Sequence, residues 1–476
     1  KYFNSFFRTG ESTESCGGAD LSLKEREEKS QGDGDAKIKG TLRKLKSRRL
    51  NEEISSDSET ESPQVSKKKD VEEERFDETA QEKKLRLAKL YLDQLREEEE
   101  KAAEDKSYEA AVIAGRLQEE VLEQKGKLQR FVARNYLVPD PVDFRLLRGH
   151  KLPVTCLVIS PDDKFIFSAS KDCSIIKWDV MSGQKLHTVP GGRKGTEDRH
   201  VGHTAHILCM AISSDGKYLA TGDMNKLIMI WDGATCKHLQ KLTGHRDAIS
   251  GLSFRKGTHD LYSASKDRAI KVWNVDENAY VETLFGHQDA ITGLDSLGRE
   301  RCVTAGGRDG TVRVWKIAEE SQLVFHGHEG SIDCIQLINE EHMITGADDG
   351  SLALWSVNKK KPLCTVKQVH GVHGDSGLEQ PHWICAVAAL HNTDLVASGS
   401  HDSQVRLWQC GDGYRNLQAL FSIPVVGFVN SLKFSNSGNF LVAGVGQEHR
   451  LGRWWRIKEA KNGIYIIPLK KQDSGK

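Results

Sequence analysis

One unit of the sequence, residues 286–315, reads GHQDAITGLDSLGRERCVTAGGRDGTVRVW. It opens with Gly-His, ends with Trp, and contains short apolar stretches separated by turn residues such as Asp309-Gly310. The Gly-His pair recurs at residues 149–150, 202–203, 244–245, 286–287 and 327–328. In each case a Trp follows the His after 27 or 28 residues. This spacing indicates a chain built from repeated units of short β-strands.

Tryptophans mark the ends of successive units: Trp178, Trp231, Trp273, Trp315, Trp355, Trp408 and Trp454. A repeat near 42 residues with Gly-His at one end and Trp at the other is typical of β-propellers. The units predict an all-β, seven-bladed propeller over residues 138–470. The ring has to be closed by strands from both chain ends, and residues 143–148 match an outermost strand. We expect them to pair with the strands of residues 429–457, and residues 464–469 are the alternative closing strand.

The rest of the chain divides by composition. Residues 1–71 are rich in Gly, Ser, Lys and Glu, which predicts a disordered, charged tail. Residues 72–137 predict an α-helical extension that opens with a capping box at Thr79 and Glu82 and ends before Pro139. Residues 471–476 form a C-terminal tail.

Both N-terminal segments carry features that suggest partners. The basic run at residues 37–49 is of the nuclear-import or nucleic-acid-binding type. In the acidic stretch after it, Ser56 and Ser58 are candidate phosphorylation sites for an acid-directed kinase. The extension carries an apolar face that we expect to bind an external partner, with packing on the protein's own propeller as the alternative. This face comprises Leu85, Ala88, Leu92, Leu95, Leu117, Val121 and Leu128.

Composition and motifs argue against an enzyme. Lys+Arg and Asp+Glu both total 68, so net charge indicates no partner. The ten cysteines form no CxxC pair, which favours reduced, buried thiols. The pairs His200/His203 and His370/His373 lack further metal ligands at a recognisable spacing. The sequence also lacks a P-loop and a GxSxG motif, so we expect no catalysis, no cofactor and no metal.

The repeats resemble the WD-repeat family. In that family a His, a Ser or Thr, an Asp and the Trp join the strands of a blade through buried hydrogen bonds, and we call these four residues a latch. Three blades match the pattern in full. They contain His150, Ser168, Asp172 and Trp178; His245, Ser263, Asp267 and Trp273; and His328, Thr345, Asp349 and Trp355.

The other blades depart from this pattern. The second has Asn225 where Asp is expected, and the fourth has Ala305 in place of the hydroxyl. The sixth has Gln380 at the His position, and the seventh lacks both the His and the Asp. We expect these incomplete blades to be less rigid than the complete ones.

Four stretches are more individual than the repeats: residues 78–92, 171–178, 306–316 and 445–458. With the acidic residues 51–62, they resemble the WD-repeat proteins specific to the U3 small nucleolar ribonucleoprotein. The resemblance implies a nuclear, nucleolar, non-catalytic component of the box C/D particle. It implies binding to the box B/C region of U3 snoRNA together with core proteins, including the kink-turn-binding protein. It also implies a place in the small-subunit processome, in the early cleavages that yield 18S rRNA.

RNA binding requires clustered basic residues, ideally with exposed aromatic rings. The best cluster surrounds Trp454-Trp455, of which strand alternation would place one in the core. Two insertions that widen the Trp spacing to 53 residues supply further basic residues. The candidates are Arg450, Arg453, Trp455, Arg456, Lys458, Arg193, Lys194, Arg199, Lys359 and Lys360. The alternative is a WD-repeat protein-interaction scaffold, such as a ubiquitin-ligase adaptor, without direct RNA binding.

Overall fold

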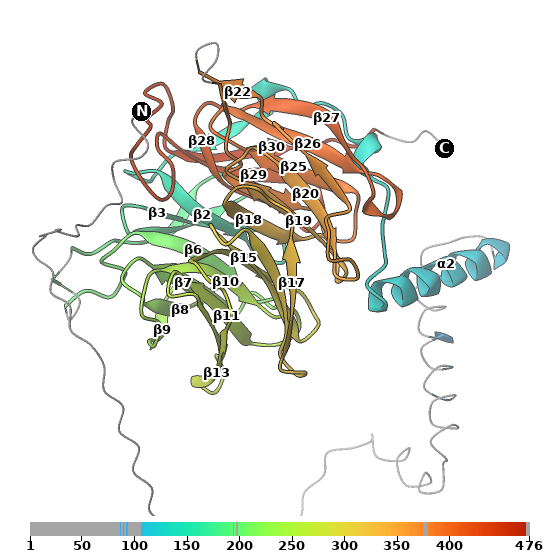
Figure 1. Cartoon of the computed structure of the whole chain (residues 1–476), viewed down its shortest axis with the longest axis horizontal. Coiled ribbons are helices and arrows are strands. Elements are labelled where there is room, and N and C mark those ends of the chain that lie inside the picture. The colour runs from blue at the N-terminus through green and yellow to red at the C-terminus, as the bar shows by residue number, and fades with distance from the viewer. Residues whose placement is uncertain are drawn as a thin grey trace, which may run out of the picture. The chain divides into compact units, whose positions relative to one another are not determined.

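A computed structural model describes residues 106–193, 195–196, 199–374 and 379–472, with Arg86, Lys89, Leu92 and Asp93. In this part of the chain, seven four-stranded sheets follow one another around a ring (Figure 1), which confirms the predicted seven-bladed propeller. The expected disordered tail lies outside the described residues, and so do Ser56, Ser58, Leu85, Ala88, Leu95 and Lys194.

We name the strand positions of a blade a to d, from the innermost strand to the outermost. Blade 1 contains β2 (Val154–Ile159), β3 (Phe165–Ser170), β4 (Ile175–Asp179) and β5 (Lys185–Val189). Blade 2 contains β6 (Ile207–Ile212), β7 (Tyr218–Asp223), β8 (Ile228–Asp232) and β9 (His238–Leu242). Blade 3 contains β10 (Ile249–Phe254), β11 (Asp260–Ser265), β12 (Ala269–Asn274) and β13 (Ala279–Phe285).

The next three blades follow the same order. Blade 4 contains β14 (Ile291–Ser296), β15 (Arg301–Gly306), β16 (Thr311–Lys316) and β17 (Ser321–His326). Blade 5 contains β18 (Ile332–Leu337), β19 (His342–Ala347), β20 (Leu352–Ser356) and β21 (Cys364–Val366). A small hairpin of β22 (Val372–His373) and β23 (Gln380–Pro381) precedes blade 6, which contains β24 (Ala386–Ala389), β25 (Leu395–Gly399), β26 (Gln404–Cys410) and β27 (Leu417–Pro424).

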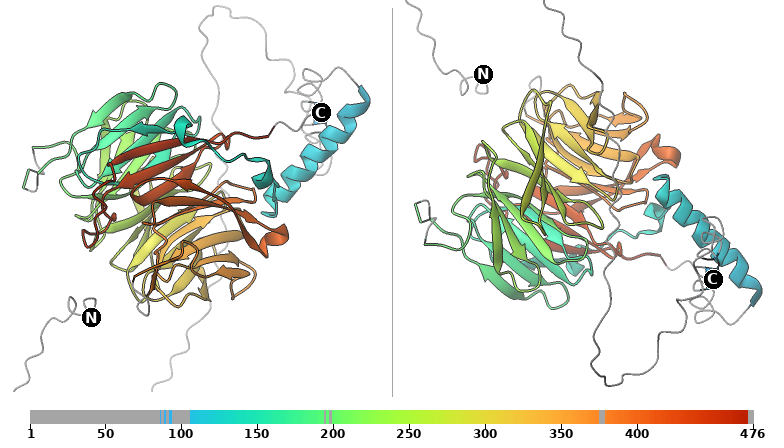
Figure 2. Two further views of the ribbon diagram at one scale, coloured as in Figure 1. Left: turned by 90° about the horizontal axis from the view of Figure 1, so that it is seen from above. Right: turned by 90° about the horizontal axis from the view of Figure 1, so that it is seen from below.

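Blade 7 closes the ring with strands from both ends of the chain. Its order is β28 (Phe428–Phe434), β29 (Phe440–Gly446), β30 (Gly463–Pro468) and β1 (Arg145–Leu147), with Arg145 opposite Ile466. In Figure 2 the red C-terminal strands accordingly lie beside the blue-green start of the ring. The first strand is outermost, as predicted, but it pairs with β30, which corresponds to the alternative closing strand at residues 464–469 and not to residues 429–457. Strand c is β30, because its isoleucines are fully buried, whereas Trp454 and Trp455 lie in a loop and are half exposed.

The direction of the strands assigns every loop to one of two faces. Neighbouring strands in a blade are antiparallel. The a–b and c–d turns therefore lie on one face of the ring, which we call the a–b face. The b–c turns and the d–a connections lie on the other, which we call the b–c face. The innermost strands line a channel between the two faces.

The core consists of clusters between neighbouring blades. Trp231 of blade 2, for example, packs in one cluster with Phe167 of blade 1. Blade 7 has Ile467 at the register where blade 1 has Trp178. Its cluster is completed from outside the blade by Ala133 and Tyr136, which precede the first strand. The described cysteines are free thiols, most of them buried, and no described helix is long and apolar enough to cross a membrane.

The helical extension ends earlier than predicted. Helix α2 runs over Lys106–Gln124, not to residue 137. Gly126 follows it with φ +70°, and the Gly126 and Lys127 N–H groups donate to the Glu123 and Leu122 carbonyls. This Schellman cap stops the helix and satisfies its last carbonyls. Gly126 is also needed for space, because a Cβ there would lie 2.7 Å from Cβ of Glu340.

Residues 125–143 form an irregular segment, which we call the strap. It includes two single 3-10 turns, Ala133–Asn135 and Pro141–Asp143. The Val132 and Ala133 N–H groups donate to Oδ1 of the buried Asp394, at 2.7 and 3.0 Å. The Tyr136 hydroxyl donates to the Gly438 carbonyl at 2.9 Å. Asp394 and Gly438 belong to a–b turns, so the strap lies on the a–b face.

The strap corrects part of the expected partner-binding face. Leu128 is only 4% exposed, and its carbonyl accepts a hydrogen bond from Asn339 of blade 5. It therefore packs on the protein's own propeller, the alternative that we had considered less favourable. On helix α2, Leu117 is half-buried and Val121 is exposed, so only these two stay available in that part of the helix. Leu92 is half-buried.

Asp394→Ala is expected to release the strap. The substitution leaves the Val132 and Ala133 N–H groups and the Gln409 amide without their acceptor. We expect a loss of roughly 2–3 kcal/mol in urea denaturation, together with faster tryptic cleavage at Lys127 and Arg130. Asp412→Ala, at an exposed turn, is the matched control and should behave as the native chain. Unchanged cleavage in Asp394→Ala would show that other contacts hold the strap.

Candidate nucleic-acid interface

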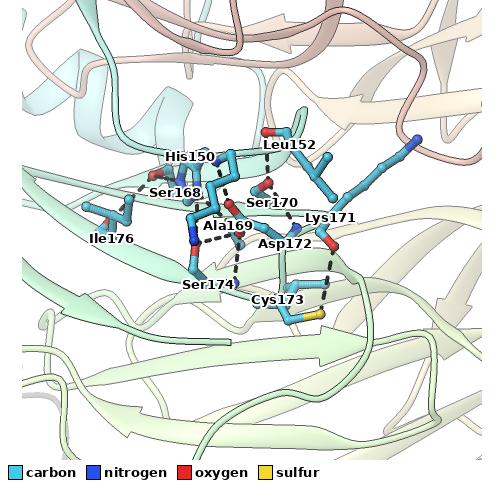
Figure 3. Close-up of polar contacts among 12 residues, drawn as sticks. His150, Leu152, Ser168, Ala169, Ser170, Lys171, Asp172, Cys173, Ser174 and Ile176 are labelled. Carbon is cyan, nitrogen blue, oxygen red and sulfur yellow. Dashed lines mark hydrogen bonds and ion pairs between the residues drawn. The ribbon is translucent and has the colours of Figure 1, made fainter. Parts of the chain in front are cut away.

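The latches are built on the b–c face from two strands, the b–c turn between them and the d–a connection. In blade 1, Nε2 of His150 lies 2.8 Å from Oγ of Ser168, and the Trp178 indole N–H donates to that same oxygen at 2.8 Å. Nδ1 of His150 lies 3.5 Å from Asp172, and Ser174 bridges the two residues (Figure 3). The two remaining blades with a full pattern are arranged similarly, with residues His245, Ser263, Asp267 and Trp273, and His328, Thr345, Asp349 and Trp355.

Blade 2 has a complete latch, contrary to our expectation. Nδ1 of His203 lies 2.9 Å from Oδ2 of Asp223, and Nε2 lies 2.6 Å from the Thr221 hydroxyl. The acid thus stands two residues before Asn225, at the end of strand β7. Blade 1 has Ser170 at this register, so the carboxylate reaches the His from the strand end instead of from the turn. The other carboxylate oxygen accepts the N–H groups of Asn225 and Leu227.

Blades 4 and 6 also have complete latches that a fixed spacing from the Trp misses. In blade 4 the hydroxyl comes from Thr304, not from position 305, because the b–c turn is one residue longer. In blade 6 the histidine is His370, with Nδ1 2.7 Å from Asp402 and Nε2 2.9 Å from Ser398. The β22–β23 hairpin is inserted after this His, so Gln380 has no latch role.

In three latches the pKa of the Asp carboxylate is lowered, as it is for Asp172, Asp267 and Asp309. Burial of Asp267 favours its neutral form, but hydrogen bonds from His245 and from two backbone N–H groups lower its pKa to about 2. A carboxylate with a lowered pKa stabilises the folded chain above its unfolded pKa, and this contribution is lost as the pH falls through the folded value. The carboxylates of these three latches therefore contribute to the stability of the fold at neutral pH.

The b–c loop of blade 7, residues 447–462, is the irregular part of this face. Trp454 and Trp455 are 51% and 46% exposed, so neither is the core residue that alternation predicted. Alternation fails because the pair lies outside any strand. The Arg453 guanidinium donates to Glu448 at 2.6 Å, and that of Arg456 donates to Gln447.

The predicted basic residues do not form one surface. Arg450 turns inward and donates to the Asp333 carbonyl at 2.9 Å, so it lines the channel. Lys359 and Lys360 are exposed in a c–d turn, on the opposite face. The b–c face presents Arg453, Arg456 and Lys458 in one loop, and Arg193 and Arg199 in the connection between blades 1 and 2.

The loop meets the second insertion in an aromatic cluster that sequence reasoning missed. The Trp454 ring centroid lies 5.9 Å from that of Trp383, and the Trp455 centroid lies 5.1 Å from that of His373. Trp383 follows strand β23 and is not one of the tryptophans that end the repeats. This irregular tryptophan was the one feature of the sequence that could have pointed to the cluster. The cluster comprises His373, His382, Trp383, His401, His449, Trp454 and Trp455.

The blade order and the latches define a WD-repeat β-propeller. The family model of the WD domain, G-beta repeat, matches residues 143–179, 196–232, 236–274, 278–316, 319–356 and 377–409. This confirms the repeat class that the Gly-His and Trp frame predicted.

Comparison with known proteins places the chain more narrowly. It is 69% identical over 396 residues to the U3 small nucleolar RNA-interacting protein 2 of Homo sapiens, covering 83% of each chain. The Ribosomal RNA-processing protein 9 of Saccharomyces cerevisiae is 27% identical, over 87% of this chain and 94% of the yeast protein. A solved structure of U3-55K matches with 68% identity and a TM-score of 0.68, covering 70% of this chain and 100% of that one. The chain belongs to the family of the U3 small nucleolar RNA-interacting protein 2.

Proposed function

We propose that this chain is a non-catalytic component of the U3 box C/D ribonucleoprotein that binds U3 snoRNA at its box B/C region. Its place would be the nucleolar small-subunit processome, in the early pre-rRNA processing that yields 18S rRNA. The names of its human and yeast relatives, an RNA-interacting and an rRNA-processing protein, support this role. The structural observation that carries the proposal is the pair of half-exposed tryptophans on a basic loop of the b–c face.

The chemistry of this loop suits single-stranded RNA. Unpaired bases stack on aromatic side chains, and Lys and Arg neutralise the phosphates between them. Trp454 and Trp455 offer the stacking surfaces, and Arg453, Arg456 and Lys458 supply the charge within the same loop. Lys171 of blade 1 donates to the Gly452 carbonyl at 3.1 Å and thereby ties this loop to the ring. An anchored loop loses less conformational freedom when it binds a ligand.

The propeller also leaves surfaces for protein partners. Core proteins of the box C/D particle, including the kink-turn-binding protein, would sit beside the RNA on the b–c face. Val121 and Leu117 of helix α2 offer a second contact, for which other processome proteins are the proposed partners. The strap joins this helix to the a–b face, so the partners of the helix and the RNA would use opposite faces of the ring.

RNA immunoprecipitation followed by sequencing tests the function itself. We expect strong enrichment of U3 snoRNA with the tagged full-length chain. RNA recovery no higher than background would instead favour the alternative, a protein-interaction scaffold without direct RNA binding.

Reversing the charge at Arg453 and Arg456 together is expected to weaken U3 binding. Each arginine replaced by Glu removes a phosphate contact and adds a repelling charge, so affinity should fall by roughly tenfold or more. The slope of log affinity against log salt should also decrease by about 2. The control is Lys359→Glu with Lys360→Glu on the opposite face, which should bind as the native chain does. A filter-binding titration measures both, and equal affinities for the two double variants would remove this loop from the RNA site.

A further inference from the structure

Three histidines outside the latches converge on the b–c face, beneath Trp455. His373 ends strand β22, His382 follows strand β23, and His401 lies in the b–c turn of blade 6. One ring nitrogen of each lies within 4.8 Å of a nitrogen of both others. Nδ1 of His382 and Nε2 of His401 are only 3.0 Å apart. The hairpin insertion thus brings two histidines onto a third that belongs to the ring.

Only some of the ring nitrogens in this cluster have partners in the protein. Nδ1 of His382 and Nε2 of His401 hydrogen-bond to each other, whereas Nδ1 of His401, a residue only 8% exposed, has no hydrogen-bond partner among the described residues. The buried Nδ1 of His373 has none in that part of the chain either. Buried polar groups normally have partners, and unpaired ones point to a missing water or ion. The latch explains the neighbouring His370, whose two nitrogens are both occupied.

The ring of His401 is held in place before any ion binds. It stacks on Phe428, with the two ring centroids 5.6 Å apart, and it is buried in the b–c turn of blade 6. A ligand that is already oriented loses less conformational freedom when it binds an ion.

We propose that His373, His382 and His401 bind one Zn²⁺ ion, with the fourth position of the tetrahedron open to water. Three imidazole nitrogens favour Zn²⁺ over Mg²⁺ or Ca²⁺, which take oxygen ligands. With Zn–N bonds of ~2.0–2.1 Å, ligand nitrogens in a tetrahedron stand about 3.3 Å apart, close to the His382–His401 separation. The ligand nitrogens of the three histidines lie within 4.8 Å of one another, so the proposal requires His373 to move toward the other two when the ion binds. This site replaces the expectation, based on spacing in the sequence, that the chain binds no metal.

The consequence of such a site is structural. The ion would tie the β22–β23 hairpin to the b–c turn of blade 6. The rings of His373 and His401 also contact the Trp455 ring, with centroid separations of 5.1 and 5.3 Å. The ion would therefore fix the two histidine rings against which the exposed Trp455 packs. The inference concerns the metal alone and does not depend on RNA binding.

Zinc titration of the full-length chain tests the proposal. After treatment with EDTA, the chain is titrated with Zn²⁺ against the chromophoric chelator zincon. We expect one equivalent to be withheld from the chelator, and Co²⁺ in its place to give the intense visible bands of a four-coordinate site. His373→Ala and His401→Gln should each weaken binding by about 100-fold or more, exceeding the usual loss on removing an outer-shell partner. His187→Ala, an exposed histidine on β5, is the control and should leave binding unchanged.

Thermal melting separates ligand loss from misfolding. Zn²⁺ should raise the melting temperature of the native chain and of His187→Ala, but not that of the two site variants. His373→Ala matters most here, because His373 lies in the inserted hairpin and not in a blade. The proposal is wrong if the native chain withholds no zinc, or if His373→Ala binds zinc as tightly as the native chain. Neither result bears on U3 binding.

Discussion

Asp223→Ala is expected to lower the stability of the propeller by about 3–5 kcal/mol, as the loss of one partner from a buried pair does. His203 and Asp223 have side chains 0% and 1% exposed, so the change leaves Nδ1 of His203 buried without its acceptor. It also removes the acceptor of the Asn225 and Leu227 N–H groups, which shape the b–c turn of blade 2. The melting temperature should fall by roughly 5 °C or more.

Asn225→Ala is the matched control for this prediction. Asn225 stands where spacing placed the latch acid, but its side chain is exposed, and its amide donates a long hydrogen bond to Thr204, at 3.5 Å. We expect its melting temperature to stay within about 1–2 °C of the native value. Asp223→Asn should fall between the two, since one amide oxygen can still accept a backbone N–H. Equal melting temperatures for Asp223→Ala and Asn225→Ala would show that this latch does not hold the blade.

Replacing Trp454 and Trp455 together by Ala is expected to weaken U3 binding by roughly 30-fold or more. A base stacked on an aromatic side chain contributes about 1–3 kcal/mol, and each 1.4 kcal/mol is a factor of ten in affinity. The fold should be retained, because both residues lie in a loop and are half exposed. Fluorescence anisotropy with a labelled box B/C fragment of U3 measures the change.

Two controls make this result specific. Phe285→Ala removes an aromatic ring that is 72% exposed on the outer strand of blade 3, and it should not alter binding. Replacing both tryptophans by Phe should restore most of the affinity, because a smaller ring still stacks. If the double Ala variant binds U3 as the native chain does, the RNA site lies elsewhere on the protein.

The fold could be predicted because its signal is periodic. Gly-His and Trp recur at nearly constant spacing, and this alone indicated the blades and the outermost position of residues 143–148. The latches of blades 2, 4 and 6 were missed for the same reason. These blades keep the hydrogen bonds of the latch, but the residues that make them stand at other sequence distances from the Trp. A search at fixed spacing therefore misses Asp223, Thr304 and His370.

The candidate functional surface could be predicted only in part, because it is not periodic. The loop with Arg453 and Trp455 was found by composition, but its exposure depends on β30 taking the third strand position. The histidine cluster joins residues of an inserted hairpin and a distant turn, which no spacing rule connects. Gly126 could have predicted the end of the helix, because glycine is common at helix C-caps. The apolar spacing continues past it to Leu128, however, and this led us to extend the predicted helix too far.

Ring closure also determines the order in which the protein can be completed during synthesis. Strand β1 leaves the ribosome before any other blade strand. It cannot pair until β30 has been synthesised, because Arg145 lies opposite Ile466. Blades 1 to 6 can each form from contiguous sequence as they emerge. Blade 7, which contains no latch, is completed last and closes the ring. A chain shortened at the C-terminus would therefore carry folded blades but an open ring, with the edges of blades 6 and 1 exposed to chaperones and to other chains.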